Sequence, residues 1–145
     1  MSVKNVLNLT SAISSKGRLG VLAAIMSAGI PTAAIADSSW TDYTVKHGTV
    51  NTAASSTLNH TKINVDSRVG IVSGNMDIHA NDTVTLKGSG EIFAFKDNRA
   101  NVGTQILGKL KSPGSMTVVL VDRNGVFFGA NSVVNVGNIV AATGK

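Results

Sequence analysis

The sequence predicts an all-β fold of short stacked strands, a β-solenoid, and three observations support this prediction. First, short apolar runs alternate with brief breaks, most clearly within Val118–Val140. Second, the breaks consist of Asn, Gly, Asp and Arg, most of which favour turns. Third, 43% of the residues are hydrophobic but only 4% are aromatic, so the core must be aliphatic. Strands this short and this tightly joined suit a chain that turns corners and stacks coil on coil.

Length and charge narrow the possible functions. The 145 residues suffice for one domain with a modest core, and the absence of Cys excludes disulfides and thiolate chemistry. The net charge of +5 would suit an acidic partner, but Lys4, Lys16 and Arg18 concentrate it at the N-terminus. Without these three the charge is +2 (5 − 3), and no run of basic residues remains along the sequence. Nucleic-acid binding, which needs clustered Lys and Arg, is therefore not expected.

Residues 1–36 have the pattern of a secretory signal peptide. A basic start precedes the apolar stretch Leu19–Ile30, which is too short for a membrane span of about 20 residues. Small residues follow at Ala34 and Ala36, and the polar Asp37 comes next. We expect cleavage after Ala36, and hence passage through the inner-membrane export machinery into the periplasm.

The mature chain is expected to have two parts. Residues 37–56 are polar, and Trp40 is either the anchor of a cap on an open core or part of a partly ordered N-terminal arm. Residues 57–145 carry the strand signal, because apolar and polar residues alternate as they do in half-buried strands. We expect this solenoid to be truncated at its C-terminus, since the chain ends directly after a strand. The predicted strand segments are Lys62–Val65, Val69–Val72, Met76–His79, Thr83–Lys87, Ile92–Phe95, Val118–Val121, Val126–Phe128, Val133–Val136 and Ile139–Ala142.

The connections between these strands carry turn and loop signals. Asn124-Gly125 is the strongest turn signal in the chain, since both residue types tolerate positive φ. Lys96–Asn101 is predicted as a charged loop. Val102–Leu110 has some helical spacing, but its two glycines disfavour a helix by about 1 kcal/mol each, so a strand or short turn is expected.

No catalytic, cofactor or metal site is predicted. Gly103–Lys109 matches a phosphate-binding loop through its lysine, but Leu110 replaces the Ser or Thr that binds magnesium. Asp77 and His79 share one face of a predicted strand, and ordinary exposed alternation accounts for them. Acid pairs of a polysaccharide-cleaving enzyme meet only in space, so the sequence leaves them open. The histidines, none of which has the spacing of a metal site, are His47, His60 and His79.

Four segments, in the same order, resemble the secretion domain of two-partner-secretion exoproteins. This domain is also called the haemagglutination activity domain, as in filamentous haemagglutinin-like adhesins. The segments are Met76–Leu86, Thr104–Leu110, Val118–Gly129 and Asn131–Thr143. Where the family usually has Asn-Pro-Asn-Gly, this chain has Asp122-Arg123-Asn124-Gly125. Asn124, Gly125 and Gly129 match the family pattern, whereas Asp122 and Arg123 depart from it.

The resemblance implies a right-handed parallel β-helix at the start of a large adhesin or haemagglutinin exported by a Gram-negative bacterium, with a role in cell adhesion and virulence. A partner outer-membrane β-barrel transporter would recognise the domain and pass it to the cell surface or the medium. There the domain would nucleate folding of the longer β-helix. No enzymatic activity and no cofactor are implied. Two alternatives stay open: a secreted β-helix enzyme acting on polysaccharide, and a module that binds host glycans or the host cell surface directly.

The resemblance also indicates which residues the transporter would recognise. The turn motif comprises Asp122, Arg123, Asn124, Gly125 and Gly129. A secondary motif comprises Gln105, Ile106, Leu107, Gly108 and Leu110.

Overall fold

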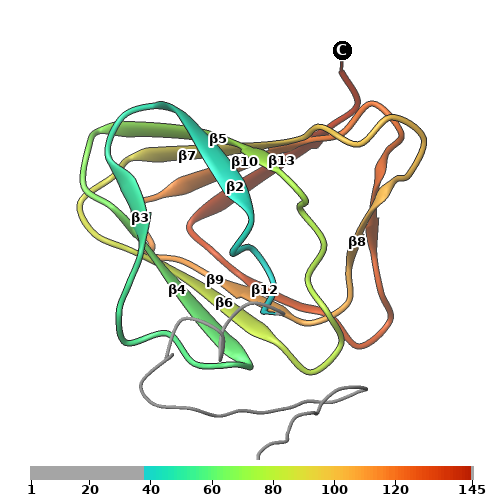
Figure 1. Cartoon of the computed structure of the whole chain (residues 1–145), viewed down its shortest axis with the longest axis horizontal. Coiled ribbons are helices and arrows are strands. Elements are labelled where there is room, and N and C mark those ends of the chain that lie inside the picture. The colour runs from blue at the N-terminus through green and yellow to red at the C-terminus, as the bar shows by residue number, and fades with distance from the viewer. Residues whose placement is uncertain (1–37, 145) are drawn as a thin grey trace, which may run out of the picture. The chain divides into compact units, whose positions relative to one another are not determined.

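The computed structural model describes residues 38–144. These residues form the coils of a β-solenoid, which Figure 1 shows end on as three-sided loops. No helix occurs among these residues, so the predicted all-β solenoid is confirmed. The predicted signal peptide, with Ala34, Ala36 and Asp37, lies outside the described residues. Within them, no helix is long and apolar enough to cross a membrane.

Each side of the solenoid is a sheet whose strands come from successive coils and pair in parallel. The first sheet contains β5 (Val69–Gly74), β7 (Ile92–Asp97), β10 (Thr117–Val121) and β13 (Asn138–Ala142). The second contains β4 (His60–Val65), β6 (Thr83–Lys87), β9 (Lys109–Lys111) and β12 (Val133–Asn135). The third side consists of β8 (Thr104–Ile106) and β11 (Val126–Phe128).

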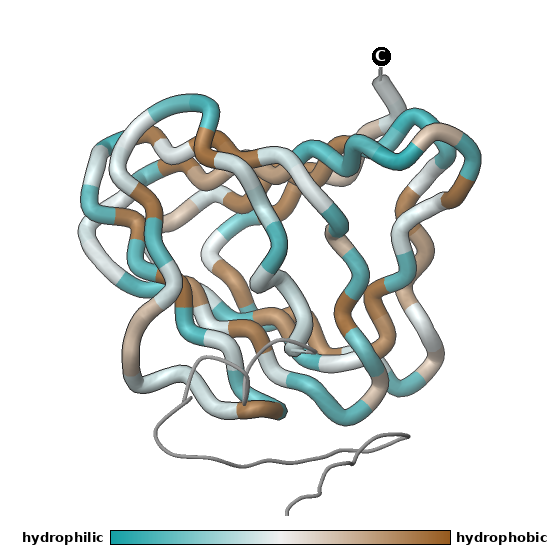
Figure 2. The backbone as a smooth tube through the Cα atoms, viewed as in Figure 1, coloured by the Kyte–Doolittle hydropathy of each residue, from teal (hydrophilic) through white to brown (hydrophobic). Residues whose placement is uncertain are grey.

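The core consists of columns of inward side chains that stack from coil to coil. Val72, Phe95 and Leu120 form one column, because they hold matching positions in β5, β7 and β10. All three are fully buried, and the alternate residues of these strands point outward. Figure 2 shows the resulting mixture of hydrophobic and hydrophilic residues along the coils. Burying each such side chain contributes roughly 1.5–3 kcal/mol, so the register is strongly specified.

Two antiparallel strands cover the N-terminal end of the core. β2 (Tyr43–His47) pairs with β5, and β3 (Val50–Thr52) pairs with β4. Trp40, just before them, is 2% exposed and lies against the rings of Phe93 and Phe95, at centroid distances of 6.0 and 5.0 Å. Its indole N–H donates a hydrogen bond to the carbonyl of Met76 at 2.6 Å. This segment thus acts as a cap on the first coil.

The last coil, at the opposite end, leaves inward-facing apolar side chains exposed. Ile139 pairs with the buried Val118, and Val134 pairs with the buried Leu110, yet they are 39% and 37% exposed. No charged residue occurs from Asn124 to Gly144. The end of the core is therefore open, apolar and uncharged within the described part of the chain.

The predicted strands correspond closely to the observed ones, with one exception. Met76–His79 is not a strand, although Ile78 forms a single parallel bridge with Ile106. Side chains take the backbone donors that a strand would use: Met76 N–H donates to Asp97 and His79 N–H donates to the hydroxyl of Ser39. The ambiguous segment Val102–Leu110 supplies β8 and the start of β9.

Candidate functional site

The predicted Asn-Gly turn is a tight turn between β10 and β11. The N–H of Gly125 donates to the carbonyl of Asp122 at 3.0 Å, and the N–H of Asn124 donates to the Asp122 carboxylate at 2.7 Å. Only Gly125 has positive φ, at 97°, whereas Asn124 does not. The turn therefore depends on the Asp122 side chain and on one glycine, rather than on two residues with positive φ.

The residues of the turn motif differ in accessibility. The side chain of Asp122 is fully buried, so it shapes the turn from inside and presents no surface to a partner. Arg123 and Asn124 are exposed. The side-chain amide of Asn124 donates to the carbonyls of Ala100 and Val102 at 3.2 and 3.3 Å, which fixes the turn on the preceding coil. Arg123 is thus the turn residue whose side chain is both charged and accessible.

The structure brings the two predicted motifs side by side. Strands β8 and β11 pair in parallel, with Gln105 of the secondary motif opposite Phe127. Both are exposed, Phe127 to 59%, and with Asn124 they line a surface hollow of about 470 Å³. We call the exposed side chains of Gln105, Arg123, Asn124 and Phe127 the corner surface. Phe127 belongs to neither residue set predicted from the resemblance, and the wholly apolar run Val126–Phe128 carries no sequence signal for its exposure.

The other members of the two motifs support the corner surface from within. Ile106 and Leu110 are core residues with no exposure. A Cβ at Gly108 would lie 2.3 Å from two backbone carbonyl oxygens, and one at Gly129 would lie 2.8 Å from the Leu107 side chain. These four positions are therefore set by packing.

A partly buried polar network lies behind the corner surface. Arg99 donates to both carboxylate oxygens of Asp77, at 2.8 and 2.9 Å, and to Oδ2 of Asp97 at 2.6 Å. The hydroxyl of Thr104 lies 2.9 Å from Asp97 and 2.7 Å from Asp122, and its single proton can be donated to either. Asp77 also accepts from the backbone N–H of Gln105 at 2.8 Å. The network thereby fixes the backbone of the corner surface.

Two pKa shifts follow from this network. Burial alone would raise the pKa of the Asp97 carboxyl, but hydrogen bonds from Arg99, from the Met76 N–H and from Thr104 outweigh burial and lower it. Hydrogen bonds to Asp97 and then Asp77 raise the pKa of the Arg99 guanidinium. Sequence reasoning missed the network, because it treated Asp77 as an exposed residue and Arg99 as part of a loop. The inward alternation of Phe93, Phe95 and Asp97 was the signal that could have revealed it.

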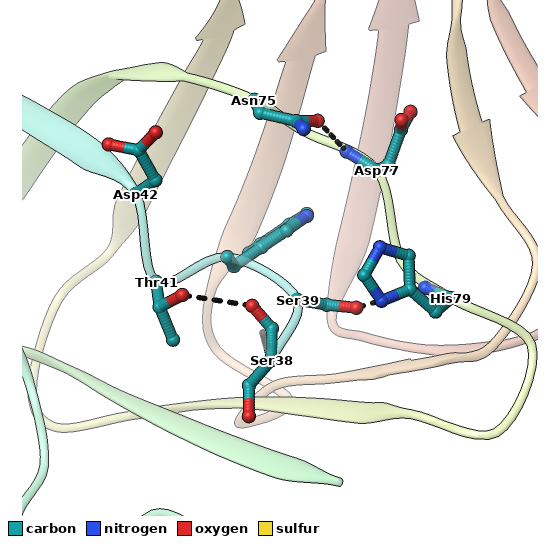
Figure 3. Close-up of a pocket in the computed structure, with 8 residues that line it drawn as sticks. Ser38, Ser39, Thr41, Asp42, Asn75, Asp77 and His79 are labelled. Carbon is teal, nitrogen blue, oxygen red and sulfur yellow. Dashed lines mark hydrogen bonds between the residues drawn. The ribbon is translucent and has the colours of Figure 1, made fainter. Parts of the chain in front are cut away.

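A second pocket, near the N-terminal cap, brings together Ser39 and His79 (Figure 3), and Asp82 lies beside them. The hydroxyl of Ser39 donates to Asp82 at 2.7 Å and accepts from the backbone N–H of His79 at 2.9 Å. The His79 ring contacts the same carboxylate at 3.3 Å. A nucleophilic triad needs the serine to donate to the histidine, whereas here both contact the acid. Ser39 is also only 2% exposed, so the arrangement holds the cap rather than activating a nucleophile.

The remaining candidates have structural explanations. Gly103–Lys109 spans β8 and the start of β9 and is followed by no helix, so its phosphate-loop pattern lacks the required context. Residues 38–144 contain no group of three His, Asp or Glu side chains that could hold a metal ion. His47 is exposed, and His60 donates to or accepts from Thr85 at 2.8 Å.

The sequence matches no model of a known protein family, and it has no significant match among curated proteins.

Proposed function

We propose that this chain is the N-terminal secretion domain of a large exported adhesin or haemagglutinin, with a right-handed parallel β-helix fold. A partner outer-membrane transporter recognises the domain in the periplasm and exports it to the cell surface. The domain acts by recognition and folding, without catalysis and without a cofactor.

The observation that carries this proposal is the corner surface. Two sequence motifs that stand apart in the chain meet there, where Gln105 of one motif pairs with Phe127, a neighbour of the other. Phe127 lines the hollow together with the exposed Val102, and aromatic residues are enriched in recognition surfaces. The partly buried pair of Asp77 and Arg99, together with Thr104, supports the backbone that carries this surface.

The architecture also supports a role in nucleating a longer solenoid. Each described coil pairs with its neighbouring coils, so folding can propagate from one end. The cap closes the N-terminal end, where Trp40 is buried. At the other end, the exposed inward side chains of Ile139 and Val134 offer an apolar surface on which a further coil can stack.

Export from bacteria tests the proposal. The chain is expressed with and without an outer-membrane transporter encoded beside it, and the protein is measured in the periplasm and the medium. We expect release into the medium only with the transporter. Equal release in its absence would contradict the proposal.

Substitutions on the corner surface test the site itself. Gln105→Ala combined with Phe127→Ser should reduce transporter-dependent release several-fold, because it removes the accessible side chains while leaving the core intact. Val140→Ser is the matched control, since Val140 is 48% exposed and lies on β13, in a different sheet. Unchanged release of the corner variant would show that the transporter reads another surface.

A further inference from the structure

The outward face of the second sheet carries four lysines. Lys62 lies on β4, Lys87 on β6, and Lys109 and Lys111 on β9. In each strand these residues alternate with buried ones, so their side chains point away from the core. We call this outward surface of β4, β6 and β9 the lysine face.

Strand register gathers these lysines from three successive coils. Lys62 pairs with Thr85, and Thr85 pairs with Lys111, so the three side chains form one row across the sheet. Neighbouring strands lie about 4.8 Å apart, which puts the backbones of Lys62 and Lys111 about 10 Å apart. Lys109 points outward two residues before Lys111, in the next row, where it pairs with Thr83. The positive charges are therefore spread over a flat surface rather than clustered at one point.

Carboxylates are absent from the strands of this face and lie only at its edges. Within residues 38–144, none of the ion pairs includes a lysine of this face. No Asp or Glu occurs on β3, β4, β6, β9 or β12. Asp82 precedes β6 but is 6% exposed and hydrogen-bonded to Ser39, and Asp66 lies at the corner after β4, beside Gly88.

His60, which lies among the lysines, responds to their field. Its ring is within hydrogen-bond distance of the Thr85 hydroxyl, at 2.8 Å. Burial lowers the pKa of His60, and the charges of Lys62 and Lys111 lower it further. The first sheet differs, because its outward positions include apolar residues such as Ile71, Val119 and Val140. Four of the six lysines within residues 38–144 thus lie on the lysine face, whereas Lys46 and Lys96 lie on the first sheet.

We propose that the lysine face binds an acidic polysaccharide, carboxylated or sulfated, that lies across several coils. Lysine ammonium groups act as separated point charges and suit anionic groups spread along a chain. Thr83, Thr85 and Asn64 lie between the lysines and offer hydrogen bonds to sugar hydroxyls. The face has no Phe, Tyr or Trp side chain on which a base of single-stranded nucleic acid could stack. This binding goes beyond the proposed export role and does not depend on it.

A charge-matched pair of variants tests the inference. Lys62, Lys109 and Lys111 are replaced by Gln in one variant, and Lys46, Arg68 and Lys96, which lie off the face, are replaced by Gln in the other. Binding of the full chain to dextran sulfate, polygalacturonate and neutral dextran is measured by calorimetry at low and physiological salt. We expect binding to both acidic polymers only, a loss of at least about tenfold in the first variant, and a loss of less than about threefold in the second.

Several outcomes would overturn the proposal. Equal losses in the two variants would mean that net charge alone drives binding, and equal binding of neutral dextran would mean that charge is irrelevant. Tighter binding to duplex DNA, or to vesicles containing anionic lipid, would assign the face to another class of partner. Export measured on the same variants separates this proposal from the secretion role, since the lysine face lies outside the corner surface.

A measurement on the unmodified chain covers the case in which a variant does not fold. Dextran sulfate bound on the lysine face should offset the charges of Lys62 and Lys111 and so raise the pKa of His60, as followed by NMR of the imidazole. The ring resonances of His47, on β2 of the other sheet, should not move. An unchanged His60 titration in the presence of bound polymer would place the polymer elsewhere.

Discussion

Arg99 holds Asp77 through two parallel hydrogen bonds, Nη1 to Oδ2 at 2.8 Å and Nη2 to Oδ1 at 2.9 Å. This bidentate geometry is suited to the planar guanidinium of arginine and is not available to a lysine ammonium. It joins the first coil, which contains Asp77, to the loop that follows β7 in the second coil. The same guanidinium neutralises Asp97, whose side chain has no exposure.

Replacing Arg99 should destabilise the solenoid strongly. Arg99→Gln leaves the buried carboxylate of Asp97 without its counter-charge, so we expect the free energy of unfolding to fall by about 3 kcal/mol. Arg68→Gln is the control, because the Arg68–Glu91 pair is exposed and should contribute less than about 1 kcal/mol. Urea denaturation of both variants measures the difference. Equal, small losses would show that the network does not hold the coils together.

Acid should destabilise the fold through its buried carboxylates. Asp97 and Asp82 both have a folded-state pKa below the ordinary value of 3.8, because hydrogen bonds outweigh burial. Such groups stabilise the fold fully above their unfolded-state pKa, and the stabilisation is lost as the pH falls through the lower folded-state pKa. We therefore expect the free energy of unfolding to decrease below about pH 4.5. Asp82→Asn should show a smaller decrease than the unmodified chain, and an equal decrease would contradict this assignment.

The strands could be predicted from the sequence because each depends on local alternation. Val118–Val121 and Val126–Phe128 alternate or run apolar between strong turn signals, and β10 and β11 form there. The burial of apolar residues alone determines where such strands form, and the order of apolar and polar residues in the sequence indicates it directly.

The lysine face and the polar network could not be predicted in the same way. Lys62 and Lys111 are almost fifty residues apart, and only the register of two strand pairs brings them into one row. Asp97 and Asp122 look like ordinary loop acids in the sequence. Both are held by Thr104, whose hydroxyl reaches them from β8. Groups that meet only through the stacking of coils leave no local pattern.

Removing the Trp40 side chain should open the capped end. Trp40→Ala deletes a buried indole that packs against Phe95 and donates to Met76, so we expect a loss of about 3 kcal/mol or more. Leu58→Ala serves as control, since Leu58 is 50% exposed and should change the stability by about 0.5 kcal/mol or less. Unfolding is followed by circular dichroism and not by tryptophan fluorescence, because Trp40 is the only tryptophan. Similar losses in the two variants would show that the cap does not stabilise the first coil.

The turn before β11 should require glycine for conformational reasons alone. A Cβ at Gly125 meets nothing within 4 Å, but φ is 97°, where a β-branched residue is strained. Gly125→Val should therefore lower the free energy of unfolding by about 2 kcal/mol. Gly114→Val tests the cause, because a Cβ there also meets nothing and the φ of Gly114 is not positive. The midpoint of thermal unfolding should be clearly lower in Gly125→Val than in Gly114→Val. Equal midpoints would contradict the role of positive φ.

Replacement by Val should stabilise the fold at one buried threonine and destabilise it at another. Thr61 points into the core opposite Val84, is 1% exposed, and its hydroxyl is the one buried side-chain polar atom without a hydrogen-bond partner in residues 38–144. Thr61→Val keeps the shape and removes the unsatisfied hydroxyl, so we expect stabilisation by about 1 kcal/mol. Thr104→Val removes a hydroxyl that bonds buried carboxylates and should destabilise by about 1–3 kcal/mol. Urea denaturation compares the two, and a loss of stability in Thr61→Val would mean that its hydroxyl has a partner such as a buried water.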